Sequence, residues 1–245
     1  MAVALFSAAD RPDLVAAAEA MGGELWPSWL STAALRAYWP SLYQGQLANY
    51  QTIAVDEASG VVVGLANSVP FPRGDSLPDT GWDWVLEQGV LAARAGNTVN
   101  ALSALSVAIR PEQRGTGLAQ RLLEAMKPPA RAAGLTSMVA PVRPTLKAAY
   151  PLQDFATYCA WRRADGTPFD PWLRTHEAMG ATVIGPAMAS QTITGTLEQW
   201  QRWTGMRFPA SGRYAIPGAL APLDIDLAAD SGICLEPNLW MEHPL

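Results

Sequence analysis

The feature that most constrains this chain is a strand-forming run followed by a glycine loop and an amphipathic helix. Residues 100–109 are mostly apolar, as in a buried strand, and they stop before Arg110-Pro111. From Leu118 onward, leucine and methionine recur at three- and four-residue spacing, which predicts one apolar helix face. The two glycines between these segments, Gly115 and Gly117, are therefore expected at the N-terminus of a helix.

Such a helix start is suited to an anion. The first backbone N–H groups of a helix have no partner inside it, and the helix dipole favours negative charge there. Glycine also lets the backbone approach a phosphate closely. A glycine pair can equally form a plain tight turn. Two other phosphate motifs are excluded, because Gln120 replaces the third glycine of a dinucleotide fingerprint and no Gly-Lys-Ser/Thr is present.

The segment resembles the CoA-binding signature of the GNAT superfamily, the CoA-dependent N-acyltransferases, which reads Arg/Gln-x-x-Gly-x-Gly/Ala between a strand and a helix. Arg114, Gly117 and Ala119 occupy its three defining positions. The aliphatic residue and the proline that the family places upstream are Ile109 and Pro111. The resemblance is firm over residues 100–140.

The resemblance implies an α/β GNAT fold with a mixed central sheet flanked by helices. It implies that the cofactor strand and the next strand, near residues 136–142, splay apart around the pantetheine arm of CoA. It also implies acetyl-CoA as the acyl donor and no metal. The residues expected to bind the donor are Val107, Ala108, Ile109, Arg114, Gly115, Thr116, Gly117, Leu118 and Ala119.

Composition indicates a compact globular protein. The chain has 245 residues, of which 49% are hydrophobic and 16% charged, and its net charge is −5. This balance argues against a nucleic-acid partner and tolerates a cationic acceptor. Cys159 and Cys234 have no zinc or Cys-x-x-Cys spacing. Without a run long enough to span a membrane or a basic leader, we expect a cytoplasmic protein, as a monomer or homodimer.

Residues 1–205 are expected to form the GNAT domain, with two helices and a hairpin ahead of the cofactor strand and insertions at about 70–98 and 143–168. Residues 206–245 are expected to be a C-terminal extension that packs on the same domain and wraps its core. In the first insertion, two tryptophans and two aspartates could wall a pocket and hold an amine, or could simply pack and cap a helix. These residues are Asp79, Trp82, Asp83 and Trp84.

The catalytic residues are less clear from the sequence. GNAT proteins commonly place a proton-donating Tyr four residues before a Gly-Phe near the end of a helix, and counting back from Gly180 reaches His176. Histidine can act as an acid or a base near neutral pH, although at a helix end it can also serve as a cation that favours the dipole. Residues 100–109 contain no carboxylate, so no base is assigned. Ser103 and Ser106 could order a water or be ordinary satisfied polar groups.

The predicted function is transfer of an acetyl group from acetyl-CoA, by direct attack, to a primary amine of a small molecule or peptide. The alternative is a catalytically lapsed GNAT-fold protein that binds or senses acyl-CoA, because the strand carboxylate and the helix Tyr are both missing. The identity of the acceptor and the length of the acyl chain are not encoded in these motifs.

Overall fold

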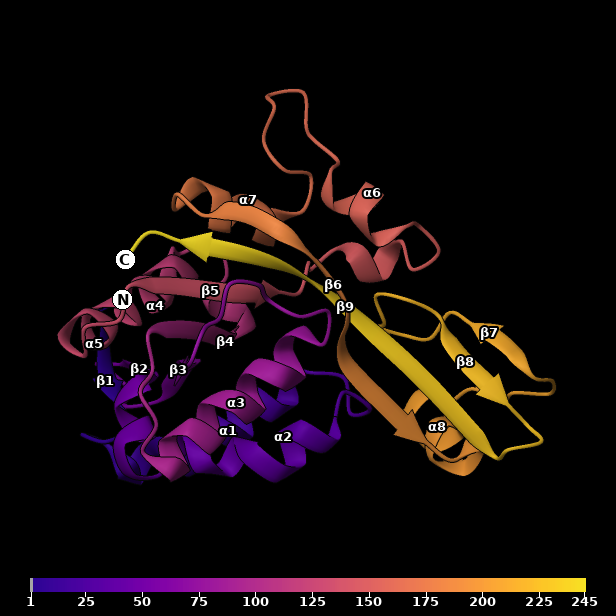
Figure 1. The fold of residues 1–245 in the computed structure, drawn as a ribbon, viewed down its shortest axis with the longest axis horizontal. Helices are drawn as coiled ribbons and strands as arrows, with labels where there is room; N and C mark the ends of the chain where they lie inside the picture. The colour runs from indigo at the N-terminus through magenta and orange to yellow at the C-terminus, as the bar shows by residue number, and fades with distance from the viewer. Residues whose placement is uncertain (1) are drawn as a thin grey trace.

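The computed structural model describes residues 2–245, which build a nine-stranded mixed sheet flanked by helices (Figure 1). Eight strands follow the order β1-β2-β3-β4-β5-β9-β8-β7, and β6 pairs with β9. The strands are β1 (Val3–Ser7), β2 (Gln51–Asp56), β3 (Val62–Phe71), β4 (Ala101–Ile109), β5 (Ser137–Val142), β6 (Thr182–Gly195), β7 (Gly212–Tyr214), β8 (Leu223–Asp226) and β9 (Ser231–His243).

Helices cover both faces of this sheet (Figure 1). The helices are α1 (Val15–Glu24), α2 (Ala33–Tyr38), α3 (Gly81–Ala95), α4 (Leu118–Ala125), α5 (Lys127–Ala132), α6 (Phe155–Cys159), α7 (Pro171–Ala178) and α8 (Leu197–Thr204). One hydrophobic cluster joins α4, α5 and α7 to one face, and two others join α1, α2 and α3 to the opposite face. The middle of the sheet is therefore covered from both sides.

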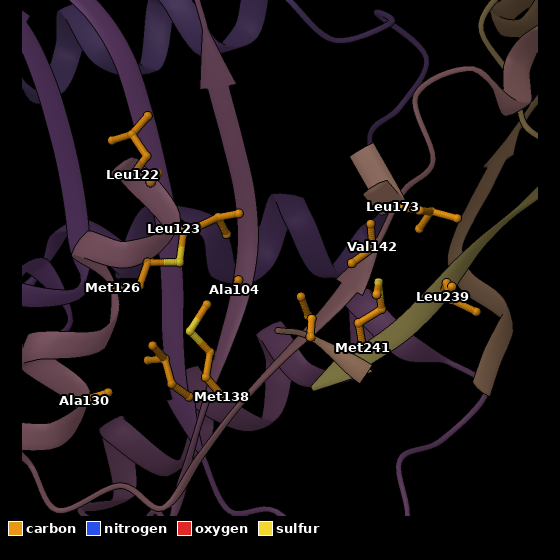
Figure 2. Packing of buried hydrophobic residues seen from close by; sticks show 14 of the residues in the cluster. Ala104, Leu122, Leu123, Met126, Ala130, Met138, Val142, Leu173, Leu239 and Met241 are labelled. Carbon is orange, nitrogen blue, oxygen red and sulfur yellow. The ribbon is translucent and has the colours of Figure 1, made fainter. Parts of the chain in front are cut away.

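The cluster under α4 and α7 is built from the apolar face that the sequence predicts (Figure 2). Leu122 and Leu123 are fully buried or nearly so and belong to the same cluster as Met138 of β5 and Met241 of β9. Burying one such side chain stabilises the fold by about 1.5–3 kcal/mol. The helix is interrupted before two prolines, since α4 ends at Ala125 and α5 begins at Lys127, just before Pro128.

Local signals place most of the other elements as expected. Asp170 caps α7 by accepting hydrogen bonds from the backbone N–H groups of Trp172 and Leu173, and Pro171 occupies the first turn. Gly96 ends α3 in a left-handed conformation with φ of 67°. In the second insertion, α6 is the only α-helix between 143 and 168 in the described part of the chain.

The C-terminal segment, expected to pack on the same domain and wrap its core, forms part of the sheet itself. Its last strand, β9, enters the sheet directly beside β5, where Met138 pairs with His243 and Val142 with Leu239. The other edge of β9 pairs with β6 along most of its length. Residues 212–243 thus contribute three strands to the sheet, and the strand predicted near 223–227 is β8.

Two further strands complete the sheet. The long strand β6 (Thr182–Gly195) runs beside β9, and its register against β9 shifts between Ala187 and Gln191. The apolar segment at the N-terminus forms β1, which pairs antiparallel with β2. Among residues 2–245, no helix combines the length and apolar character needed to cross a membrane.

Candidate functional site

The candidate site lies where β4 parts from β5. The two strands are parallel and pair only through Ala101–Ser137, Leu102–Met138 and Ser103–Val139. Beyond that point β4 keeps β3 as its neighbour but has lost β5, which continues beside β9. The residues of β4 from 101 to 105 are buried, whereas Ser106, Val107 and Ile109 are partly exposed. The predicted splay of these strands is therefore present, and it exposes one backbone edge of a central strand.

A β-bulge marks the start of this open half. Asn67 of β3 pairs with Ser106 and Ser68 pairs with Ala104, which leaves Leu105 without a partner in the ladder. The carbonyl oxygen of Leu105 accepts a 2.8 Å hydrogen bond from Nε1 of Trp82 at the start of α3. Trp82 is buried and stacks on Trp39 at 5.9 Å between ring centroids. Of its two predicted roles, Trp82 therefore takes the packing role.

The glycine loop has the geometry of an anion cradle. Gly115 and Gly117 have φ of 77° and 82°, which is the left-handed region, and Gly117 is the residue directly before α4. The backbone N–H groups of these two glycines donate to no other group within residues 2–245. Thr116 is fixed by a 2.7 Å hydrogen bond from its hydroxyl to the carbonyl oxygen of Gln113. The loop thus directs unpaired donors outward at a positive helix end.

Space around the loop also fits a phosphate. A Cβ atom added at Gly115 would meet nothing within 4 Å, and one at Gly117 would meet only the flexible end of Gln120, at 3.7 Å. Backbone conformation rather than crowding therefore requires glycine here. Neither glycine is crowded by the rest of the chain on the side where a Cβ atom would stand.

Arg114 is the cation best placed to meet that phosphate. It is exposed and forms no ion pair within residues 2–245. By contrast, Arg121 donates to the carbonyl oxygen of Val3, and Lys127 pairs with Glu124 at 2.7 Å. Those two side chains have structural partners, whereas Arg114 has none within residues 2–245.

The other residues predicted to bind the donor lie on both sides of β4. Val107 and Ile109 pack against the cluster under α4, and Ala108 belongs to the cluster under α1. Leu118 is buried at the first position of α4, and Ala119 is half-buried beside it. Val107, Ile109 and Leu118 therefore lie on the same side of the sheet, and Ala108 lies on the other.

On the opposite face, a buried polar network ends at Ser106. The Ser106 hydroxyl donates to Oδ1 of Asn67 at 2.9 Å. Nδ2 of Asn67 donates to Oη of Tyr43 at 2.8 Å and to Oε1 of Gln51 at 3.0 Å. Burial raises the pKa of Tyr43 well above its usual value, so its phenol is neutral at physiological pH. Sequence inspection noted Ser106 but not its partners, since an Asn inside an apolar strand gives no indication of what it bonds.

His176 is buried and turned toward β9. Its Nδ1 lies 2.7 Å from Nε2 of His243, and its ring meets Trp172 edge-on at 4.6 Å between centroids. Burial lowers the pKa of both histidines, and the neighbouring His243 lowers that of His176 further. The ring is therefore neutral near pH 7, so the alternative of a charged helix-end residue does not hold. Within residues 2–245, the remaining ring nitrogens, Nε2 of His176 and Nδ1 of His243, have no hydrogen-bond partner.

A hollow of about 460 Å³ opens where α2, α3 and β6 meet. Its wall includes two acidic side chains, Asp83 and Glu87, and one cation, Arg36. Asp83 accepts hydrogen bonds from the Thr32 hydroxyl and the Thr192 N–H, while burial raises its pKa to about 6. Like Asp79, which accepts from the N–H of Met188, Asp83 ties α3 to β6 and does not cap the helix.

Comparison with known proteins places this geometry in a family. The model of the acetyltransferase (GNAT) family matches residues 18–155. The chain is 34% identical over 272 aligned residues to arginine N-acetyltransferase avaD of Aspergillus versicolor, covering 98% of this chain and 93% of that protein.

Solved structures share the fold over the whole chain. The loading GNATL domain of CurA from Lyngbya majuscula is 18% identical with a TM-score of 0.62, and 98% of it is covered. The GphF GNAT-like decarboxylase, in complex with isobutyryl-CoA, is 16% identical with a TM-score of 0.58, and 99% of it is covered. At these identities the likeness concerns the fold alone.

The family match, the relative and the shared fold agree with the predicted GNAT fold and with the predicted enzyme class. They do not support the alternative of a lapsed binding or sensing protein. The chain belongs to the GNAT family and is an N-acetyltransferase.

Proposed function

We propose that this enzyme transfers the acetyl group of acetyl-CoA to the amine of a small guanidine-bearing molecule such as arginine. The part of this proposal that concerns acetyl-CoA is supported by one observation. The edge of β4 that has no strand partner leads directly to the glycine loop. The acceptor half rests on the similarity to an arginine N-acetyltransferase over almost the whole chain.

On the donor side, the free N–H groups at Gly115 and Gly117 and the side chain of Arg114 bind the pyrophosphate. The pantetheine arm then follows the open edge of β4. The backbone of Val107, Ala108 and Ile109 holds the arm and the acyl carbonyl. Backbone N–H groups can stabilise the oxyanion that develops on that carbonyl, so aliphatic side chains are sufficient on this strand.

The acceptor must approach from the other face. The phosphate loop and α7 occupy the α4 side of the sheet, so the amine reaches the thioester from the side of α1–α3. The hollow between α2, α3 and β6 opens on that side, and its two carboxylates against one arginine favour a cationic molecule. This balance suits a guanidinium group.

The reaction joins the amine nitrogen to the acyl carbon and breaks the carbon–sulfur bond. The ammonium of the free acceptor loses a proton to become the nucleophile, and the departing thiolate gains one. His176 remains the predicted proton donor to the thiolate, and His243 sets the orientation of its ring. Because burial keeps His176 neutral, its ring could give up an N–H proton only while taking up another, and the second proton that the acceptor nitrogen loses after attack would balance this exchange.

The proposal is tested with purified full-length protein, acetyl-CoA and a panel of amines. The panel includes arginine, a guanidine compound without a carboxylate, and primary amines without a guanidinium. Release of free CoA thiol that depends on arginine, with an acetylated product, supports the proposal. Equal turnover of every amine would contradict a guanidine-bearing acceptor while leaving the transferase assignment in place.

A further inference from the structure

We propose that Ser106 binds the acceptor amine, and that the Gln51–Asn67 network forces its hydroxyl to present only lone pairs to that amine. The proposal rests on the function above and adds a residue on the acceptor side of the thioester. It starts from Gln51, whose side chain is completely buried at the end of β2.

The orientation of the Gln51 amide is fixed by backbone groups. Its Nε2 donates to the carbonyl oxygens of Leu47 and Ser68, at 2.8 and 2.9 Å. Its Oε1 accepts from the backbone N–H of Ser68, at 3.2 Å. If the amide were flipped, its oxygen would lie against the carbonyl oxygens of Leu47 and Ser68, and its NH₂ group would lie against the N–H of Ser68. None of these contacts would be a hydrogen bond. Since all these partners are buried, only the observed orientation satisfies them.

The orientation of the Gln51 amide also determines the orientation of the Asn67 amide. Because Oε1 of Gln51 is an acceptor, the group that Asn67 turns toward it must be the Nδ2 donor, at 3.0 Å. The second hydrogen of Nδ2 goes to Oη of Tyr43. Oδ1 of Asn67 therefore faces Ser106, and it can only accept.

The single proton of the Ser106 hydroxyl is thus committed to Asn67. Two lone pairs remain on Oγ, so any further partner of this oxygen must be a donor. An ammonium or amine is such a donor, whereas a carbonyl is not. The network fixes the Ser106 hydroxyl in one orientation before the ligand binds, so the hydroxyl does not have to rotate when the amine arrives.

The position of Ser106 matches this role. It follows the bulge residue Leu105 and precedes Val107, where the backbone predicted to hold the acyl carbonyl begins. It is also the first residue of β4 that is partly exposed. Through Asn67 it belongs to the face covered by α1–α3, from which the acceptor approaches.

Ser103 offers a matched control on the same strand. Its side chain is completely buried, and its hydroxyl makes only a 3.3 Å contact to the carbonyl oxygen of Ala104. Ser103→Ala removes the same atom as Ser106→Ala, three residues away, in the half of β4 that is paired with β5. It therefore reports the effect of losing a serine hydroxyl from this strand without loss of an acceptor contact.

The experiment measures steady-state kinetics with the amine that the wild type uses best, together with acetyl-CoA affinity and Tm. Losing a hydrogen bond to a charged group predicts that Ser106→Ala lowers kcat/KM for the amine by about ten- to a hundredfold. Acetyl-CoA affinity should stay near the wild-type value, whereas Tm should fall by a few degrees because Oδ1 of Asn67 loses its donor. Ser106→Thr keeps the hydroxyl and should recover much of the activity, and Ser103→Ala should keep amine kinetics.

An unchanged kcat/KM in Ser106→Ala overturns the proposal, as does an equal loss in Ser103→Ala. If Ser106→Ala has a lowered Tm, Ser106→Thr decides, because a folded Thr variant without recovered amine kinetics also overturns it. The proposed acceptor class is judged separately, from the wild type alone. Wild type that acetylates only amines without a guanidinium removes that class but leaves the Ser106 comparison valid. Wild type that acetylates no amine overturns both.

Discussion

The hydroxyl of Ser106 donates to Oδ1 of Asn67 across a distance of 2.9 Å, between neighbouring strands β4 and β3. The two residues face each other at the point where β4 loses β5 and a bulge interrupts its ladder with β3. A single interstrand pair therefore connects a buried polar network to the exposed edge of the strand that leads to the glycine loop.

Replacing Gly117 should weaken acetyl-CoA binding. In Gly117→Val, the left-handed φ costs about 1–2 kcal/mol, and the new side chain enters the space expected to hold the phosphate. We expect the Kd for acetyl-CoA to rise about tenfold or more, measured by calorimetric titration.

Gly134 provides the control for this change. It also has a left-handed conformation, with φ of 73°, and open surroundings, but it lies in the turn between α5 and β5. Gly134→Val should lower the free energy of unfolding by a similar amount and leave acetyl-CoA affinity unchanged. Similar affinity losses in both variants would mean that backbone strain, rather than a phosphate contact, explains the effect.

Arg114 should contribute a charge-assisted contact to the CoA phosphates. Because the side chain is exposed, its contribution is screened, and Arg114→Ala should raise the KM for acetyl-CoA by about tenfold at low salt. The difference from wild type should shrink as ionic strength rises. Arg131→Ala, at an exposed position of α5, should leave this KM unchanged. A wild-type KM for Arg114→Ala at every salt concentration would exclude the contact.

The buried histidines predict acid sensitivity. In the unfolded chain both rings titrate near pH 6.5, whereas burial lowers both pKa values in the folded protein. Below pH 6.5 the unfolded state therefore binds more protons, so stability is fully present above that pH and falls as the pH decreases. Each ring contributes up to about 1.4 kcal/mol per pH unit.

Urea unfolding at pH 7, 6 and 5 measures this dependence, and His243→Gln isolates the contribution of the pair. This variant removes one ring and the hydrogen bond to His176, while Lys127 and Glu124, which also affect the pKa of His243, stay in place. Its free energy of unfolding should change less between pH 7 and pH 5 than that of the wild type. Equal slopes for the two proteins would show that the histidines ionise as freely in the folded state as in the unfolded one.

The predicted role of His176 in protonating the thiolate can be separated from its role in packing. His176→Gln removes the imidazole of residue 176. His243→Gln removes the other partner of the same 2.7 Å hydrogen bond but leaves the imidazole of His176 in place. Proton donation predicts that kcat falls about a hundredfold in His176→Gln and far less in His243→Gln. Comparable losses of Tm with wild-type kcat in both variants would limit the pair to a structural role.

The donor side of this site could be predicted from sequence because its signals are local. The strand, the two glycines and the helix lie within about thirty residues, and each follows from spacing or backbone conformation. The break at Lys127 follows from Pro128 in the same way. These elements need no knowledge of what packs against them.

The acceptor side could not be predicted, because it depends on contacts between distant segments. Trp82 reaches Leu105, and Ser106 reaches Asn67 and Tyr43, only after the sheet and its helices have assembled. The pairing of β9 with β5 joins strands about a hundred residues apart, and no periodicity in the tail indicates which edge it will find. For the same reason, nothing in the sequence indicates that His243 is the partner of His176.

The most direct test is mass spectrometry of the product formed from acetyl-CoA and arginine by the purified full-length enzyme. We predict a product heavier than arginine by one acetyl group, formed in proportion to the CoA thiol released, and much less of it with Gly117→Val. Release of CoA thiol without acetylated arginine, or with the same yield from wild type and Gly117→Val, would contradict this assignment.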